Sequence, residues 1–253
     1  MTIAIMRGIS PRFAECEITH IERTPIDLEL ARAQHHAYGD ALRNLGCDVI
    51  ELPAEPELPD SVFVEDTAFI LPEVTVTTRP GAASRRPETE SIVRALTPLV
   101  KLVHVREPAT VDGGDVLVLG KRIYIGLSTR SNREAIDQLN KILSEYGYSV
   151  TGVALQDCLH LKSAVTRVDD HTLLINKNWV DANCFTNFDL IDIDPSEPHA
   201  ANCLPIGASI IFPSAFPKTC AKLEKRGYNL VTVDVSELAK AEGAVPCCSL
   251  ILP

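Results

Sequence analysis

The sequence predicts an α/β fold, a five-bladed propeller in which five ββαβ units surround a central site. Three observations carry this prediction. Pairs of short apolar strands, each followed by a polar loop, an amphipathic helix and a third strand, recur along the chain in the same order. The entry points to the first strands lie at nearly constant spacings of 46, 48, 42 and 45 residues, which is typical of repeats around an axis. These five entry points are all polar or nucleophilic, and we expect them to converge at one end of the axis: Asp66, Asp112, His160, Asn202 and Cys247.

The unit in the middle of the chain shows the pattern most clearly. Residues 115–120 (DVLVLG) and 122–127 (RIYIGL) are expected to form a hairpin. Ser131 or Asn132 then caps an amphipathic helix, and Gly147 lies at its C-terminal end. A strand at 148–155 completes the unit.

The other units follow the same order with weaker signals. One pairs strands at 68–71 and 75–78, with a helix near 89–96 and a strand at 100–105. The next pairs 164–168 with 171–176, before a weak helical segment and a strand at 190–194. Another pairs 203–206 with 209–213, before a helix near 217–226 and a strand at 229–235.

The two chain ends are expected to complete the fifth unit. The last strand, 249–252, finds its partner in 2–8, which a helix at 27–45 and a strand at 48–52 follow. Each unit is too small to fold alone, so we expect a single domain spanning residues 1–253. An α+β or doubly wound sheet with accidental regularity is the alternative.

Composition and charge narrow the class of ligand. The 253 residues carry 24 Lys and Arg against 34 Asp and Glu, a net charge of −10. This acidity argues against nucleic acid, whose phosphates bind basic surfaces. It mildly favours a small cationic ligand.

The eight cysteines include no C-x-x-C pair, which disfavours a thiolate zinc knuckle or a thioredoxin-type motif. The apolar run at the N-terminus is too short for a signal peptide, and no apolar stretch approaches the roughly 20 residues of a membrane span. We expect a cytoplasmic protein with reduced thiols and no membrane contact.

Three residues at the strand starts have the chemistry of a nucleophilic site. Cys247 is a candidate nucleophile, and strand alternation would turn Cys247 and Cys248 to opposite sides, so that only one faces the axis. His160 is a candidate general acid and base. Asp112, before two glycines, could orient the imidazole. Each of these residue types, taken alone, more often has a structural role. Their equivalent positions in the repeated units favour a functional role.

Acidic and basic residues elsewhere suit a zwitterionic, cationic ligand. Asp60, Glu65 and Asp66 precede a strand and could pair with a guanidinium and an ammonium group. Arginines in the loops after second strands could hold a carboxylate in fork geometry, and the residues alone do not choose among Arg79, Arg85, Arg86 and Arg130.

These motifs together resemble the dimethylarginine dimethylaminohydrolases, a family of the guanidino-group-modifying (pentein) superfamily. The resemblance covers essentially the whole chain in order. It is carried by segments that include Asp60…Phe63-Val-Glu65-Asp66, Asp112-Gly-Gly-Asp115, His160-Leu-Lys-Ser163 and Cys247-Cys248-Ser249.

The resemblance implies a propeller with its active site on the axis and hydrolysis of Nω-methylated arginines to citrulline and methylamines. It assigns Cys247 as the nucleophile, with a covalent thiouronium intermediate, His160 as general acid and base, and Asp112 as the residue that orients His160. The implied substrate contacts are Asp60, Glu65, Asp66, Arg85, Arg130, the backbone near Ile18 in a lid, and the carbonyl of Ala241.

The resemblance also bears on cofactors, partners and substrate. It implies no metal or organic cofactor, although zinc could bind Cys247 and His160 as an inhibitor. The expected ligand is a small cationic amino acid, and the chain could be a monomer or a homodimer. Arginine deiminases typically have His-x-Asp where this chain has His160-Leu-Lys162. That difference predicts an apolar, roomy side suited to a methylated nitrogen.

Two alternatives stay open. A related pentein could act on arginine, citrulline or another guanidino or ureido compound. A non-catalytic homologue could bind arginine-like ligands without consuming them.

Overall fold

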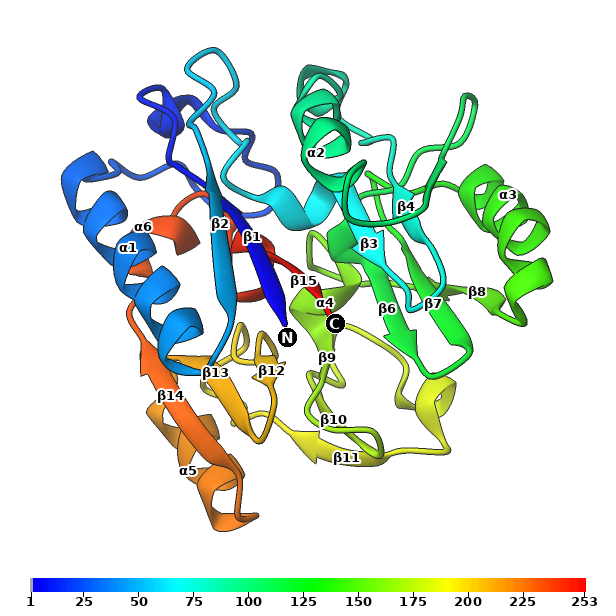
Figure 1. Cartoon of the computed structure of the whole chain (residues 1–253). Coiled ribbons are helices and arrows are strands. Elements are labelled where there is room, and N and C mark those ends of the chain that lie inside the picture. The colour runs from blue at the N-terminus through cyan, green and yellow to red at the C-terminus, as the bar shows by residue number, and fades with distance from the viewer. Residues whose placement is uncertain (1) are drawn as a thin grey trace.

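The structure, a computed structural model, describes residues 2–253. Its fifteen described strands form five separate sheets of three strands each (Figure 1). In every sheet the central strand is antiparallel to one neighbour and parallel to the other. The predicted ββαβ units therefore correspond to the sheets of an α/β fold.

Four of the sheets each come from one continuous stretch of chain. They are β3 (Ala68–Ile70), β4 (Thr75–Thr77) and β5 (Leu102–His104); β6 (Val116–Leu119), β7 (Arg122–Leu127) and β8 (Ser149–Ala154); β9 (Val165–Arg167), β10 (Thr172–Ile175) and β11 (Asp189–Asp192); and β12 (Leu204–Ile206), β13 (Ser209–Pro213) and β14 (Asn229–Val233).

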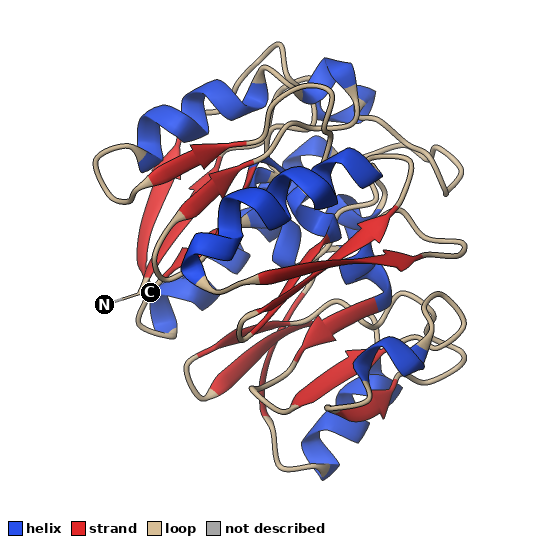
Figure 2. Ribbon diagram, turned by 90° about the vertical axis from the view of Figure 1, so that its right-hand side faces the viewer, coloured by secondary structure: helices blue, strands red, loops and turns tan. Residues whose placement is uncertain are grey.

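The fifth sheet joins the two ends of the chain, as predicted. The strand β1 (Ile3–Arg7) pairs with the last strand, β15 (Leu250–Leu252), and with β2 (Asp48–Leu52). The first and last strands lie side by side in Figure 1, and the marks for the two chain ends are also neighbours in Figure 2. This closure matters for function because Cys247 immediately precedes β15.

Helices connect the parallel strand pairs in four of the five units. They are α1 (Leu28–Asn44), α2 (Glu88–Leu96), α3 (Arg133–Leu143) and α5 (Pro217–Lys225), which lie around the outside of the molecule in Figure 1. The unit of β9, β10 and β11 has only a 3-10 turn at Ala182–Phe185, in line with its weak helical signal. Two one-turn helices, α4 (Leu161–Ala164) and α6 (Ser236–Ala239), complete the set.

The helix boundaries follow the predicted capping residues. The side chain of Asn132 accepts a hydrogen bond from the backbone N–H of Ala135, and Asp27 caps α1 through the N–H groups of Glu29 and Leu30. Gly147 has a φ of 77°, a left-handed conformation that glycine adopts without steric cost. Asn132, rather than Ser131, is thus the cap of α3.

Five hydrophobic clusters lie between successive sheets and tie them together. Each cluster takes buried residues from two neighbouring sheets. In chain order, representative members are Ile5 and Ala68, Val76 and Ile123, Tyr124 and Leu173, Leu174 and Phe212, and Ile211 and Met6. The last cluster connects the β12–β13–β14 sheet back to the sheet of the chain ends, so the clusters link the five sheets in a cycle.

The chain enters two of the first strands through short helical turns, with consequences for the site. The segments before β9 and β15 are helical: α4 follows His160, and a 3-10 turn spans Pro246–Cys248. Within residues 2–253, none of the helices has the length and apolar character needed to cross a bilayer.

Candidate active site

A small cavity lies where the segments that precede the first strands meet. It is lined by seven of the ten predicted site residues: Asp60, Asp66, Arg85, Arg130, His160, Ala241 and Cys247. Its volume of about 20 Å³ admits roughly one water molecule. Asp112, Glu65 and Ile18 do not line it. Asp112 contacts the lining residue His160, and Glu65 lies near the lining residue Cys247.

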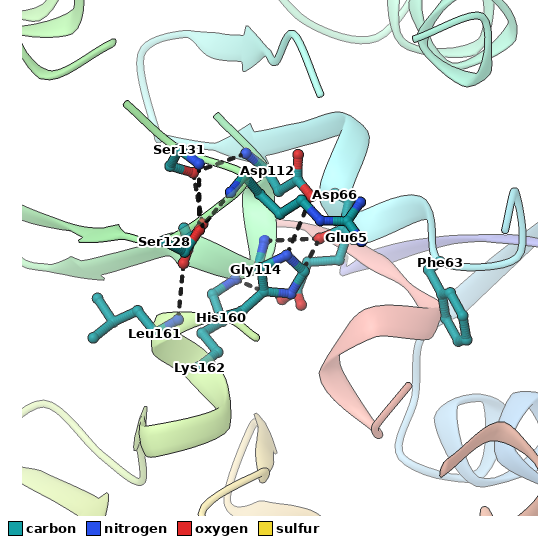
Figure 3. Close-up of polar contacts among 12 residues, drawn as sticks. Phe63, Glu65, Asp66, Asp112, Gly114, Ser128, Ser131, His160, Leu161 and Lys162 are labelled. Atoms are coloured by element: carbon teal, nitrogen blue, oxygen red, sulfur yellow. Dashed lines mark hydrogen bonds and ion pairs between the residues drawn. The ribbon is translucent and has the colours of Figure 1, made fainter. Parts of the chain in front are cut away.

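The imidazole of His160 lies among carboxylates (Figure 3). Its Nε2 is 3.2 Å from Oδ2 of Asp112, and its Nδ1 is 3.9 Å from Oδ1 of Asp66. Burial disfavours the imidazolium, but Asp66, Asp112 and Asp115 outweigh it and raise the pKa of His160 to about 9. His160 is therefore protonated at neutral pH.

The position of His160 is fixed by Asp115, a residue to which the sequence analysis assigned no role in the site. Oδ1 of Asp115 accepts a hydrogen bond from the backbone N–H of Leu161, the first residue of α4. Its Oδ2 accepts hydrogen bonds from the hydroxyls of Ser128 and Ser131. The turn that carries His160 is thereby tied to the neighbouring unit.

The two glycines after Asp112 are sterically required. A Cβ on Gly114 would lie 2.5 Å from Nδ1 of His160, and one on Gly113 would lie 1.9 Å from the carbonyl oxygen of Glu65. The backbone of these glycines therefore packs closely against the imidazole and against the segment that carries the acids.

Asp66 and Arg85 form a buried ion pair with Glu88. Nη1 of Arg85 donates to Oδ2 of Asp66 at 2.6 Å, and Nη2 donates to Oε2 of Glu88 at 2.9 Å. Burial raises the pKa of Asp66, but His160 and Arg85 prevail and lower it to about 2. Glu88 was missed, although Arg85-x-x-Glu88 has the spacing of an i, i+3 ion pair on a helix.

Glu65 is held by Lys162, a pairing that the sequence did not reveal. Nζ of Lys162 is 2.6 Å from Oε1 of Glu65, whereas the buried Oε2 accepts no hydrogen bond from the described residues. The prediction of an apolar, roomy side at Lys162 is therefore wrong. The chain turns into α4 at Leu161, and this turn brings the ammonium group of Lys162 to Glu65.

Cys247 is the cysteine of the tandem pair that reaches the cavity. It lies in the 3-10 turn Pro246–Cys248, half-buried, while Cys248 is buried in a hydrophobic cluster. The two thiols do face different ways, but the turn, and not strand alternation, separates them. Burial and the nearby Glu65 and Asp66 hold the pKa of the Cys247 thiol well above its usual value.

A loop at residues 16–21 borders the cavity, which its Glu17 lines. Both carboxylate oxygens of Asp60 accept the backbone N–H of Glu17, and Nη2 of Arg130 donates to the hydroxyl of Thr19. Glu242, which the sequence analysis missed, accepts the backbone N–H groups of Thr19 and His20 at 2.7 Å each. We call residues 16–21 the lid.

The fourth predicted convergent position lies elsewhere. Asn202 does not reach the cavity of Cys247 and His160, because its side chain donates to the carbonyl of His199 and lines a second, larger cavity. The prediction that all five strand starts meet at one site is thus wrong at Asn202.

The fold and the site together define a class: an α/β chain of five three-stranded sheets with a thiol, an imidazolium and several buried carboxylates at one cavity. A family model described as "N,N dimethylarginine dimethylhydrolase, eukaryotic" matches residues 19–251. The chain belongs to the dimethylarginine dimethylaminohydrolase family.

Individual relatives agree with this assignment. The N(G),N(G)-dimethylarginine dimethylaminohydrolase of Pseudomonas aeruginosa is 38% identical over 88% of this chain and 89% of its own length. The Streptomyces coelicolor protein of the same name is 39% identical over 98% of this chain and 96% of its own. A solved structure of a cysteine-to-serine mutant of the Pseudomonas protein with citrulline has a TM-score of 0.94 at 34% identity, covering 98% of both chains.

Proposed function

We propose that this chain hydrolyses Nω-methylated arginines, namely asymmetric dimethylarginine and monomethylarginine, to citrulline and methylamines. The observation that carries the proposal is the meeting of Cys247 and His160 in one acidic cavity, in a member of this family. Oε2 of Glu65, buried without a hydrogen-bond donor among the described residues, adds an acceptor suited to a guanidinium N–H.

The high thiol pKa favours activation of Cys247 by the substrate itself. Carboxylates near Cys247 disfavour a thiolate until a guanidinium cation offsets them. Substrate binding then releases the thiol proton to solvent. The thiolate attacks the guanidinium carbon and forms a neutral tetrahedral adduct.

Protonated His160 supplies the next proton. It protonates the methylated nitrogen, the C–N bond breaks, and the methylamine leaves a thiouronium on Cys247. Neutral His160 then takes a proton from the water that attacks this carbon. The C–S bond breaks, the hydroxyl proton passes to the sulfur, and citrulline and the thiol are formed. Asp112, at 3.2 Å from Nε2, orients the imidazole throughout.

The remaining predicted residues are proposed to bind the substrate. Asp66 and Glu65 face the guanidinium, Asp60 and the carbonyls near Ile18 and Ala241 face the ammonium group, and Arg130 with Arg85 holds the carboxylate. Arg130 is the freer of the two arginines, because Arg85 already pairs with two buried carboxylates. The cavity of about 20 Å³ cannot take an arginine side chain, so the lid must open for substrate.

We further propose that the five sheets form one closed propeller domain over residues 1–253. The cycle of hydrophobic clusters supports this closure. Eight free cysteines support a reducing, cytoplasmic location. Zinc inhibition at Cys247 and His160, and the choice between a monomer and a homodimer, stay predictions.

The deciding experiment measures citrulline released from asymmetric dimethylarginine, with Cys247→Ser as the control. We expect turnover by the native chain and a loss of at least about 10³-fold in the variant. Arginine and its monomethyl form, at equal concentration, distinguish a dimethylarginase from a deiminase. Absence of turnover on every guanidino and ureido substrate would refute the proposed function.

A further inference from the structure

A second cavity, larger than the catalytic one, lies behind the lid. Its volume is about 360 Å³, within the range of small-molecule sites. His20 and Ile21 of the lid line it, as do Pro213 of β13 and two residues of α6. The two cavities are neighbours, because Leu159, Glu242 and Gly243 line both of them.

The lining of this second cavity is aromatic and acidic. Trp179, Phe216 and His199 supply rings, with Trp179 and His199 in edge contact at a centroid distance of 5.0 Å. Asp157 and Glu242 supply carboxylates, and no lysine or arginine of the described chain joins them. Aromatic faces and carboxylates together attract an organic cation.

The backbone around the second cavity is held in unusual conformations. Asp157 and Glu242 are the two non-glycine residues of positive φ among residues 2–253, at 51° and 59°. Such conformations are unfavourable for most residues and concentrate at ligand sites and switch regions. Asp157 precedes His160 by three residues, and Glu242 follows Ala241, so both strained segments continue into the catalytic cavity.

We propose that this second cavity is a ligand site, distinct from the catalytic one, for a small arylalkylammonium ion. The ring of the ligand packs against Trp179 and Phe216, and its ammonium group lies toward Asp157. The site does not depend on the reaction proposed above, because none of these three side chains lines the catalytic cavity.

Fluorescence of the single tryptophan tests the proposal directly, because Trp179 lines the cavity. The probe is 2-phenylethylammonium, and 3-phenylpropionate, similar in size and opposite in charge, is its control. We expect a saturable change in Trp179 emission with the cation and at least about tenfold weaker binding of the anion. No saturable change, or equal binding of both ions, would overturn the proposal.

Three variants locate the binding. Asp157→Asn keeps a residue that tolerates positive φ and removes the charge, and should weaken binding at least about threefold. Asp170→Asn, at an exposed turn, is the matched control and should bind like the native chain. Ala215→Phe, at an exposed lining position, should fill the cavity and abolish binding. Native affinity in either cavity variant would contradict the assignment.

Discussion

At the scale of single residues, the site depends on how burial and charge set protonation. His160 is buried, yet its surrounding carboxylates raise its pKa to about 9, above the ordinary value of 6.5. Its proton therefore stabilises the folded state fully below pH 6.5, and this contribution is lost as the pH rises through about 9. The resting state pairs an imidazolium with a neutral thiol, which is the starting state that the proposed reaction needs.

Replacing Asp112 by asparagine should shift the pH dependence of turnover. The variant removes a hydrogen-bonded carboxylate, so the pKa of His160 falls and the alkaline limb of the kcat profile moves down by about one unit. Steady-state rates between pH 6 and 10 measure the shift. Asp170→Asn provides a control with no expected change, and an unmoved alkaline limb would count against the orienting role of Asp112.

Alkylation should distinguish the two adjacent cysteines. The pKa of Cys247 lies well above its usual value, so iodoacetamide should label the resting protein slowly at pH 7 and faster as the pH rises. Cys248 is buried in the hydrophobic cluster and should stay unlabelled in the folded chain. Peptide mass spectrometry identifies the site, and labelling of Cys248 in place of Cys247 would reverse the assignment.

At the scale of elements, the lid is held by side chains from distant parts of the chain. Asp60, Arg130 and Glu242 each hydrogen-bond to it, and Glu242 does so across 223 positions of sequence. Cys16 and Ile18 pack against a hydrophobic cluster, whereas Glu17, Thr19 and His20 are exposed. The exposed part of the lid therefore depends on these polar contacts for its position.

Substituting Glu242 by glutamine should loosen the lid. Glutamine keeps the side-chain length but offers one acceptor oxygen in place of two, so one N–H of Thr19 or His20 loses its partner. We expect the loss of this hydrogen bond to destabilise the closed lid by roughly 1 kcal/mol. Trypsin cleavage after the exposed Arg23 should therefore accelerate several-fold. Glu224→Gln, on the surface of α5, is the matched control. Cleavage at the native rate would show that Glu242 does not hold the lid closed.

At the scale of the whole molecule, the position of Cys247, the proposed nucleophile, depends on the pairing of the two chain ends. Cys247 is placed by β15, which pairs with β1 and packs in the cluster of Ile5 and Leu250. Truncating a buried side chain in this cluster should therefore reduce both stability and activity. Truncating an exposed apolar side chain should affect neither.

The matched pair Leu250→Ala and Leu99→Ala tests this dependence. Leu250 is 3% exposed, so its truncation should cost about 2–5 kcal/mol of unfolding free energy. Leu99 is 40% exposed, and its truncation should change stability by less than about 0.5 kcal/mol. Urea unfolding measures both. Equal stabilities of the two variants would contradict a structural role for the closure.

Much of this architecture could be predicted from the sequence because its signals are local. Apolar periodicity, the cap at Asn132 and the left-handed turn at Gly147 lie within short segments. The spacing of the units predicted that Asp66, Asp112, His160 and Cys247 meet, since equivalent positions of repeated units occupy equivalent places. The contacts of the lid, in contrast, do not recur from unit to unit, so the repeat could not predict them.

By itself, then, the sequence determined the order of the units, the closing pair of strands and most of the residues that line the cavity. The tertiary structure alone decided which charges meet: Lys162 with Glu65, Arg85 with Asp66, and Glu242 with the lid. It also placed Asn202 in the lining of a second cavity. The physical reason is that side-chain pairing depends on how the units pack against one another. It also depends on short turns such as α4, which change the direction of the chain and so of the side chains that follow.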